Sequence, residues 1–168
     1  MLGIDRVVKV AVVVGGRRMM MLGSNNYLGL TTDPRVKQAA NEATERYGTG
    51  MGGSRCLNGT TDLHTDVERR IARFLRRQAA VYYTSGYLAN VGVIPALVGR
   101  GDLVFSDALN HACLIDGARL SGAEIQVFPH GNVAALDGML RRCPASRRKL
   151  VIVDAVFSMD GDIAPLPA

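Results

Sequence analysis

Hydrophobic residues follow two different spacings along the second half of the chain. Short continuous apolar runs alternate with longer stretches in which apolar residues recur at about every third or fourth position. The runs are typical of buried strands, and the stretches are typical of helices. Four strands are predicted, at residues 79–84, 103–106, 125–128 and 150–157. Helices are predicted between them, at residues 86–98, 112–120 and, after an N-cap at Asn132, up to Arg142.

This alternation determines the expected fold class. Strands joined through helices run parallel with right-handed crossovers, and the helices cover both faces of the sheet. We therefore predict an α/β fold with a mostly parallel sheet. The alternation breaks off after the fourth strand, because no further helical pattern follows it.

The first part of the chain is patterned differently. Two β-rich runs, residues 7–14 and 17–22, flank a pair of glycines and predict a hairpin with a tight turn. A helix is predicted to begin after Asp33, with a proline in its first position, and to end at Gly48. A second helix is predicted from Thr61, because the apolar residues after it recur at helical spacing.

Composition and charge narrow the possible function classes. The 168 residues are 48% hydrophobic and 21% charged, which is typical of a folded domain with a core. Aromatic residues make up 5% and tryptophan is absent, so no nucleic-acid surface built on stacking is expected. The net charge of +5 owes much to residues 141–149. A solvated helix end explains that cluster most simply, and a phosphate-bearing ligand is the alternative.

Cysteines and histidines are scattered along the sequence. Cys56, Cys113 and Cys143 show no paired spacing, which argues against a disulfide framework or a zinc site. Unpaired cysteines favour a reducing compartment, so we expect a cytoplasmic location. The histidines lack metal-ligand spacing, and no metal site is predicted. No apolar run approaches the roughly 20 residues of a membrane span, so none is predicted.

A glycine-rich segment contains a misleading motif. Gly48, Gly50 and Gly53 satisfy the G-x-G-x-x-G pattern of dinucleotide-binding proteins. The pattern follows a predicted helix, whereas such a site needs a strand before the glycines and a helix that starts within them. A nucleotide-dependent oxidoreductase therefore ranks third among the hypotheses.

A better anion site lies at residues 84–87, where a predicted strand turns directly into a helix. Ligands of open α/β sheets collect at the carboxyl ends of strands, and N–H groups at a helix start favour phosphate. Gly86 allows close approach of the backbone, and Tyr87 offers a ring beside a planar ligand. An ordinary strand-to-helix turn, with Tyr87 in packing, explains the same residues.

Two further strand ends carry polar side chains. His111 follows the second predicted strand by a short loop, and Ser158 directly follows the fourth. Because parallel strands end at one edge, amides, an imidazole and a hydroxyl are expected together there, which favours a functional site. Asp154 lies in the last strand near that edge. Two aspartates after Ser158 flank a glycine, and a turn explains them better than a metal.

Five ordered segments give these residues a recognisable pattern. They are residues 24–30, 48–55, 84–90, 107–112 and 156–162. In this order they strongly resemble the α-oxoamine synthases, a family dependent on pyridoxal 5'-phosphate (PLP) that includes 8-amino-7-oxononanoate synthase and glycine C-acetyltransferase. The resemblance covers nearly the whole chain from about Gly16. It implies the large-domain sheet of the type I PLP-transferase fold, cut short.

The resemblance also implies an activity and a domain layout. Family members use PLP to condense an amino acid, such as glycine, alanine or serine, with an acyl-CoA thioester into an α-amino ketone. The full-length parent is expected to be a homodimer. Residues 1–30 are expected to form an N-terminal hairpin and substrate loop, and residues 31–168 an incomplete PLP-binding large domain. Individual segments are similar to both named branches, so both stay open.

Site residues follow from the matched positions. The expected cofactor-binding residues are Ser85, Gly86, Tyr87, His111, Asp154 and Ser158. The resemblance implies that His111 is the catalytic histidine stacked on the pyridine ring and that Ser158 lies near the ring oxygen O3′. It implies that Asn25 lies close to the substrate carboxylate. Asp154 stands where many relatives carry glutamate.

The lysine that holds such a cofactor as a Schiff base is not expected in this chain. Lys9 lies in the presumed hairpin, Lys37 near a helix start and Lys149 at the amino end of a strand. The first hypothesis is therefore the front portion of an α-oxoamine synthase, inactive on its own. The second is a non-catalytic domain that binds a phosphate ligand or pairs with a lysine-bearing partner.

Overall fold

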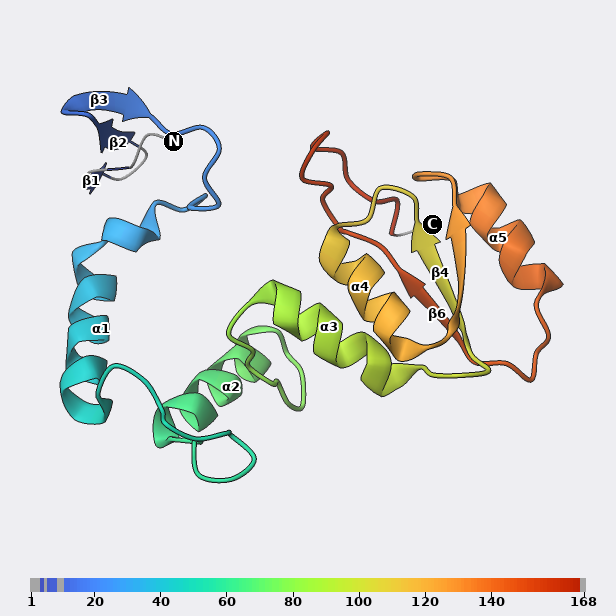
Figure 1. Cartoon of the computed structure of the whole chain (residues 1–168), viewed down its shortest axis with the longest axis horizontal. Helices are drawn as coiled ribbons and strands as arrows, with labels where there is room; N and C mark the ends of the chain where they lie inside the picture. The colour runs from blue at the N-terminus through green and yellow to red at the C-terminus, as the bar shows by residue number, and fades with distance from the viewer. Residues whose placement is uncertain (1–3, 5, 9–10, 167–168) are drawn as a thin grey trace. The chain divides into compact units, whose positions relative to one another are not determined.

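The computed structural model describes residues 4, 6–8 and 11–166 (Figure 1). The chain forms two compact units, Met1–Gln78 and Ala79–Ala168. Each unit contains a three-stranded sheet of its own. The predicted layout, with a boundary after residue 30, stays a prediction.

The first unit begins with an antiparallel sheet. Its strands, in spatial order, are β1 (Arg6–Val8), β2 (Ala11–Val14) and β3 (Arg17–Met20). Gly15 and Gly16 join β2 to β3 with φ angles of 54° and 75°. Two consecutive left-handed residues form a turn whose twist matches that of a hairpin, so the predicted hairpin is confirmed. The first predicted run, residues 7–14, is however divided between β1 and β2, and Lys9 lies outside the described residues.

Two helices complete the first unit after the short 3-10 turn η1 (Leu30–Thr32); they are α1 (Pro34–Tyr47) and α2 (Asp62–Phe74). Asp33 caps α1, because its Oδ1 accepts the backbone N–H of Arg35 at 2.8 Å. Thr61 caps α2, and its own backbone N–H donates to Nδ1 of His64 at 3.2 Å. Both predicted helix starts are confirmed, since caps depend on residues within one turn.

A parallel sheet forms the centre of the second unit. β4 (Leu103–Asp107) pairs in parallel with β5 (Glu124–Phe128) on one side and β6 (Lys149–Ile152) on the other. The register places Asp107 opposite Phe128 and Ser106 opposite Ile152, so all three strands end at one edge. Every residue of β4 is buried, as expected of a central parallel strand.

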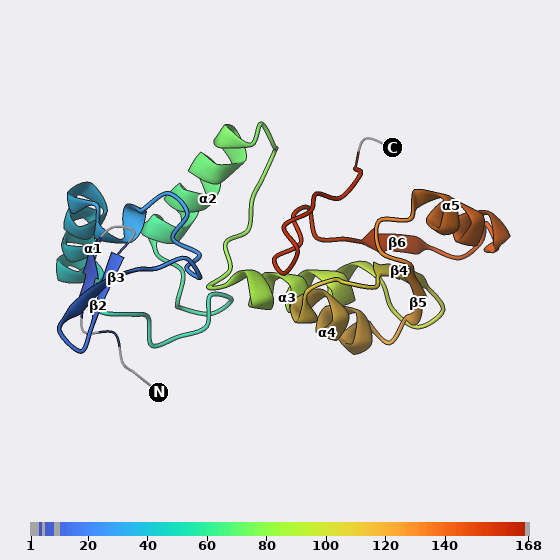
Figure 2. The same cartoon turned by 90° about the horizontal axis from the view of Figure 1, so that it is seen from above.

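Helices cover both faces of this sheet (Figures 1 and 2); they are α3 (Gly86–Leu97), α4 (Ala112–Ser121) and α5 (Val133–Arg142). Val104 belongs to a core cluster with residues of α3 and α4, whereas Leu103 and Phe105 pack with residues of α5. Successive residues of a strand point to opposite faces, so α3 and α4 share one face and α5 covers the other. The predicted α/β fold is confirmed. Among the described residues, no helix has the length and apolar character that crossing a bilayer requires.

Two strand predictions differ from the structure. Residues 79–84 form no strand, because no described strand pairs with them and a strand exists only through its ladder. The predicted strand at residues 150–157 ends early, at Ile152. The backbone N–H of Asp154 instead donates to Oδ1 of Asn110 at 3.0 Å, which removes a donor that a longer ladder would need.

Candidate functional site

The start of α3 presents backbone N–H groups near His111, which follows the carboxyl end of β4. Ser85 has extended backbone angles and its Oγ accepts the N–H of Leu88 at 3.1 Å, so its hydroxyl caps the helix. The N–H groups of Gly86 and Tyr87 are the first two of the helix, and the helix contains no carbonyl four positions earlier that could accept their hydrogen bonds. A Cβ added to Gly86 would meet no atom within 4 Å, so the space beside the Cα of Gly86 is open. This arrangement suits an anion.

Tyr87 links the start of α3 to α4. Its hydroxyl donates to the carboxylate of Asp116, and this bond raises the pKa of Tyr87. The ring stands edge-on to that of His111, with 6.5 Å between ring centroids and an interplanar angle of 80°. The predicted phosphate turn and the predicted stacking histidine are therefore neighbours.

His111 occupies the N-cap of α4 and remains exposed. Its Nδ1 accepts the backbone N–H of Cys113 at 3.1 Å and lies 2.9 Å from the Sγ of the same residue. The backbone bond places the lone pair on Nδ1, so the neutral ring carries its proton on Nε2. The cap fixes both the orientation and the tautomer of an exposed imidazole.

Asp154 and Asn110 fix the loop that carries His111. The Oδ2 of Asp154 accepts the backbone N–H of His111 at 2.7 Å. Asn110 is buried, and its Nδ2 donates to Oγ of Ser106 at 3.0 Å and to the carbonyl of Ile152 at 2.8 Å. The carboxylate of Asp154 thus holds a backbone amide and reaches the site through His111.

Ser158 lies at the exposed tip of a closed turn, residues 156–163. The N–H of Phe157 donates to the carbonyl of Asp162 at 2.9 Å, and the N–H of Gly161 donates to the carbonyl of Phe157 at 2.8 Å. Gly161 has a φ of 78°, a conformation that glycine adopts without strain. We call this segment the Ser158 turn.

A charged cluster lies at the same edge. The ring nitrogens of His130 reach Oδ1 of Asp107 at 2.8 Å and Oδ2 of Asp162 at 2.6 Å. Asp107 is 2% exposed and also accepts the N–H groups of Leu109 and Gly131, at 2.8 and 2.9 Å. Burial raises the pKa of Asp107, but these amide donors and the imidazole outweigh it and lower the pKa. The two carboxylates, Asp107 first, raise the pKa of His130.

The structure brings most of the predicted site residues together, but not all of them. Contacts connect Tyr87 to His111 and His111 to Asp154 within the second unit. Asn25 belongs to the first unit, where its Oδ1 accepts the hydroxyl of Tyr27 at 3.4 Å. Its place near a substrate stays a prediction.

The glycine-rich segment follows a helix rather than a strand, as the sequence predicted, and this context argues against a dinucleotide site. Gly48 ends α1, and the following loop leads to α2. A Cβ on Gly53 would collide with the side chain of Asn58, and one on Gly59 with the carbonyl of Gly53. These glycines let the loop pack against itself, and the structure shows them in no phosphate cradle.

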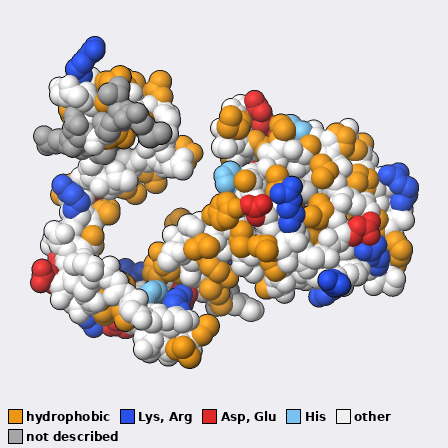
Figure 3. Space-filling view, in the orientation of Figure 1, with side chains coloured by type: hydrophobic (Ala, Val, Ile, Leu, Met, Phe, Trp, Pro, Cys, Tyr) orange, Lys and Arg blue, Asp and Glu red, His pale blue; other side chains and the backbone are white. Residues whose placement is uncertain are grey.

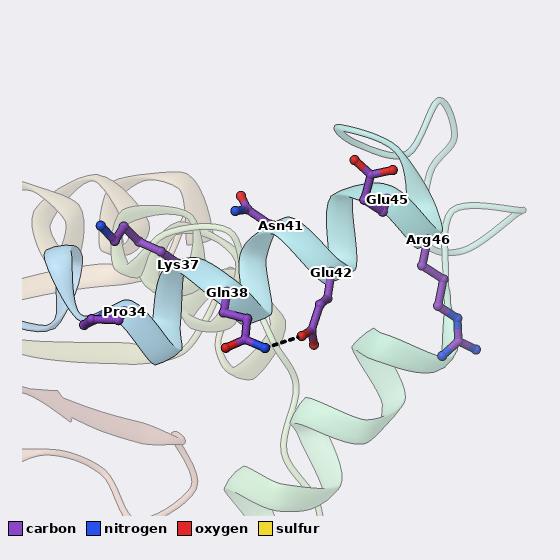
Figure 4. A pocket seen from close by; sticks show the side chains of 7 residues that line it. All are labelled: Pro34, Lys37, Gln38, Asn41, Glu42, Glu45 and Arg46. Atoms are coloured by element: carbon purple, nitrogen blue, oxygen red, sulfur yellow. Dashed lines mark hydrogen bonds between the residues drawn. The ribbon is translucent and has the colours of Figure 1, made fainter.

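Neither described lysine belongs to the carboxyl edge of the parallel sheet. Lys149 is at the amino end of β6, where its Nζ donates to the carbonyls of Pro144 and Arg147 at 2.9 and 3.3 Å. Lys37 belongs to the first unit and lies along an open hollow on the face of α1, near Gln38 and Asn41 (Figure 4). That hollow is lined by one helix alone, so it lacks the walls of a ligand pocket.

The sequence pattern assigned no role to Asp107, Asn110 or His130. The sequence does contain one signal for Asp107. It is a polar residue at the end of an apolar strand, and a buried polar residue needs hydrogen-bond partners. His130, which bonds to Asp107, lies more than twenty positions away along the chain, so no local pattern identifies it as a partner.

Comparison with known proteins identifies the family. A family model of aminotransferase class I and II matches residues 17–168. The curated 8-amino-7-oxononanoate synthase of Geobacter sulfurreducens is 55% identical over 157 residues, and that of Lysinibacillus sphaericus is 50% identical over 156. These matches include 94% and 93% of this chain but 40% of each relative. The chain therefore spans about 40% of the length of the curated relatives it matches.

Solved structures give the same answer. A serine palmitoyltransferase from S. paucimobilis, described with a bound PLP–myriocin aldimine, matches with a TM-score of 0.96 and 41% identity, over 99% of this chain and 42% of that one. The 8-amino-7-oxononanoate synthase of Francisella tularensis matches with a TM-score of 0.70 and 27% identity, over 84% and 38%. The predicted type I PLP-transferase fold is confirmed. The chain belongs to the aminotransferase class I and II family and, within it, to the α-oxoamine synthases that its ordered segments resemble.

Proposed function

We propose that this chain forms part of a PLP-dependent C-acyltransferase of the α-oxoamine synthase type. The reaction condenses an amino acid with an acyl-CoA thioester to give an α-amino ketone. Relatives named 8-amino-7-oxononanoate synthase, at 55% identity, favour that branch over glycine C-acetyltransferase. The observation that carries the proposal is the meeting of Tyr87, His111 and Asp154 at one sheet edge beside the open start of α3.

The start of α3 fits the phosphate of PLP. The N–H groups of Gly86 and Tyr87 supply donors, and the space around Gly86 admits an approaching ligand. The dipole of this 12-residue helix favours a dianion at its N-terminus. Ser85 keeps its hydroxyl on the N–H of Leu88, so we propose that it shapes the phosphate site by holding the first turn.

His111 and Ser158 fit the ring of the cofactor. When bound, the cofactor supplies an electron sink for the α-carbon of the substrate. The exposed imidazole of His111 is held by its cap and offers a face on which a flat ring can stack. The hydroxyl of Ser158, at the exposed tip of its turn, would help to hold the ring through its oxygen O3′. Asp154 acts through His111, because its carboxylate holds that residue's backbone N–H.

The substrate site and the assembly are part of the same proposal. Asn25 is proposed to bind the carboxylate of the amino acid, and the complete enzyme is proposed to be a homodimer in the cytoplasm. Exposed apolar side chains of α3, including Leu88 and Leu97, support a partner surface, and hydrophobic side chains gather there in Figure 3. The free cysteines Cys56, Cys113 and Cys143 support a reducing compartment.

A second candidate function is ligand binding without catalysis. The Nζ of Lys149 is bonded to carbonyls at the amino end of β6, opposite the edge where His111 lies. That position favours a phosphate-binding domain that obtains a lysine from a partner chain.

A titration with PLP tests the proposed site. We expect the backbone amide signals of Gly86 and Tyr87 to shift and saturate. The His111→Ala variant should bind PLP about fivefold more weakly, the worth of one aromatic stack. His64→Ala is the matched control, because His64 belongs to the first unit, where its ring accepts the N–H of Thr61, and it should bind like the wild type. Amide signals of Gly86 and Tyr87 that stay in place at saturating PLP would contradict the proposal.

Borohydride reduction separates the two candidate functions. After reduction in the presence of PLP, mass spectrometry locates any lysine that carries the cofactor. The front portion of an acyltransferase should bind PLP saturably, with no specifically modified lysine and no release of coenzyme A. A modified lysine on a second chain that co-purifies with this one supports the binding domain that obtains its lysine from a partner. A single modified lysine within this chain would contradict both.

A further inference from the structure

We infer that His130 is a positioning residue that holds the Ser158 turn against the end of β4. The inference deepens the proposed function, because Ser158 is the residue proposed to contact the cofactor ring. The contacts of His130 with the turn and with β4 are independent of that role.

Both nitrogens of the His130 ring donate to carboxylates. Nδ1 lies 2.8 Å from Oδ1 of Asp107, and Nε2 lies 2.6 Å from Oδ2 of Asp162. An ionised carboxylate only accepts hydrogen bonds, so both nitrogens must carry protons and the ring is an imidazolium. Among the described residues, Asp107 and Asp162 are the charged groups recorded in contact with this ring. A neutral ring could keep only one of the two bonds.

The Ser158 turn meets His130 at both of its ends. Phe157 is 3% exposed, and its ring packs edge-on against the imidazole with 4.4 Å between centroids. Asp162 closes the other end, because its carbonyl accepts the N–H of Phe157 while its carboxylate bonds to His130. Ser158 lies between these two attachments, so its position depends on the ring of His130.

The other side of His130 is bonded to a rigid anchor. Asp107 is the buried last residue of the central strand, and it also accepts the N–H of Leu109, two positions before His111. One imidazolium therefore connects the loop of His111 to the turn of Ser158. Charge-assisted hydrogen bonds of this kind are about twice as strong as neutral ones.

Amide hydrogen exchange tests the attachment directly. In Asp162→Asn the bond between His130 and Asp107 is kept, and the carboxylate charge that faces Nε2 of His130 is removed. We expect exchange at Phe157 and Gly161 to become about tenfold faster, which is the effect of losing one bond to a charged group. His130→Gln should give the same local effect. Exchange in the centre of β4, at Phe105, should stay unchanged in Asp162→Asn.

A control separates positioning from a general loss of stability. His64→Gln replaces a histidine of the first unit and should leave exchange in the Ser158 turn unchanged. Equal acceleration at Phe157 and Phe105 in Asp162→Asn would show a merely structural role and overturn the inference. Unchanged exchange at Phe157 and Gly161 in both variants would overturn it as well.

The absorbance spectrum of bound PLP tests the consequence for the site. Compared with the wild-type protein loaded with PLP, the Asp162→Asn variant loaded in the same way should show a shifted absorbance of the cofactor and a raised Kd. The His64→Gln variant should show neither change. An altered turn in a protein that binds no PLP would support the role of His130 and contradict the proposed function. An unaltered turn in a protein that binds PLP would contradict the role of His130 and support the proposed function.

Discussion

Asn110 and Asp154 hold each other's loops at the end of the sheet. The Oδ1 of Asn110 accepts the backbone N–H of Asp154 at 3.0 Å, and the Oδ2 of Asp154 accepts the N–H of His111, the neighbour of Asn110, at 2.7 Å. Two loops that follow β4 and β6 are therefore locked by side chains more than 40 positions apart. The orientation of His111 depends on this pair.

Replacement of Asn110 by alanine should destabilise the protein strongly. The change removes the partner of the carbonyl of Ile152, which is buried, and of the N–H of Asp154, which is half-buried. We expect the free energy of unfolding to fall by about 2–3 kcal/mol, because unsatisfied buried polar groups retain their full desolvation cost. Urea unfolding measures the loss. Asn132→Ala, which removes an exposed cap of α5, should cost only about 1 kcal/mol. Equal losses in the two variants would contradict the prediction.

Gly117 should tolerate no added methyl group. A Cβ there would lie 2.7 Å from the carbonyl oxygen of Asn90 and 2.9 Å from Cδ1 of Ile94, so α3 and α4 would have to separate. Gly117→Ala is expected to lower stability by about 1–3 kcal/mol through overpacking. The matched change Gly138→Ala lies in α5, where the nearest atom, Nη1 of Arg142, is 3.5 Å away. There the helix propensity of alanine should raise stability by about 0.5–1 kcal/mol.

His130 should make stability depend on pH on the alkaline side. Asp107 and then Asp162 raise its pKa, so the folded protein holds the proton more tightly than the unfolded chain, where histidine titrates near about 6.5. The stabilisation is fully present below that unfolded value and is lost as pH rises through the raised folded pKa. Urea midpoints measured from about pH 6 upward should therefore fall in the wild type more than in His130→Gln. Parallel pH profiles in the two proteins would disprove the prediction.

Asp102 should stabilise the opposite edge of the sheet. It is 7% exposed and accepts the N–H of Gly99 at 2.9 Å, while Arg148 donates to both of its oxygens at 3.2 and 2.7 Å. The bond from Gly99 and then that from Arg148 lower the pKa of Asp102, so its stabilisation is lost as pH falls through the lowered value. Asp102→Asn should lower the urea midpoint at neutral pH. The exposed pair of Asp137 with Arg141, 2.8 Å apart, is the control, and Asp137→Asn should change the midpoint little.

Local signals in the sequence predicted more of this molecule than long-range ones. The starts of α1 and α2 follow from Asp33 and Thr61, because a cap and its donors lie within one turn. Residues 79–84 have the composition of a strand, but a strand needs a partner and no described strand supplies one. The early end of β6 depends on Asn110, which lies far away in the sequence.

The candidate site also contains features that the sequence could predict and features that depend on long-range contacts. The position of His111 could be predicted, since the ends of parallel strands share an edge and His111 follows β4. Tyr87 was expected at that edge after a strand at residues 79–84, which does not form, and its contacts with Asp116 and His111 place it there instead. The bonds of His130 with Asp107 and Asp162 depend on how three loops fold back, and spacing along the chain does not encode that. Ser85 was predicted to bind cofactor, and the structure shows its hydroxyl capping α3.

Tyr87 should contribute to cofactor binding through its hydroxyl as well as its ring. The hydroxyl donates to Asp116 of α4, which holds the first turn of α3 beside His111. In Tyr87→Phe this bond is lost while the ring is kept, so the N–H groups of Gly86 and Tyr87, which we propose bind the phosphate, become less well ordered. We expect the Kd for PLP to rise about tenfold, the effect of losing one hydrogen bond to a charged group.

The matched control for Tyr87→Phe is Tyr83→Phe. Tyr83 precedes α3 and its ring packs near Gly92, so loss of its hydroxyl leaves the start of α3 unchanged. Equilibrium dialysis with PLP should therefore give the wild-type Kd for Tyr83→Phe and a raised Kd for Tyr87→Phe. If Tyr87→Phe binds PLP as tightly as the wild type, the contact between Tyr87 and Asp116 serves only to pack α3 against α4. The phosphate site must then be assigned to the backbone of residues 85–87 alone.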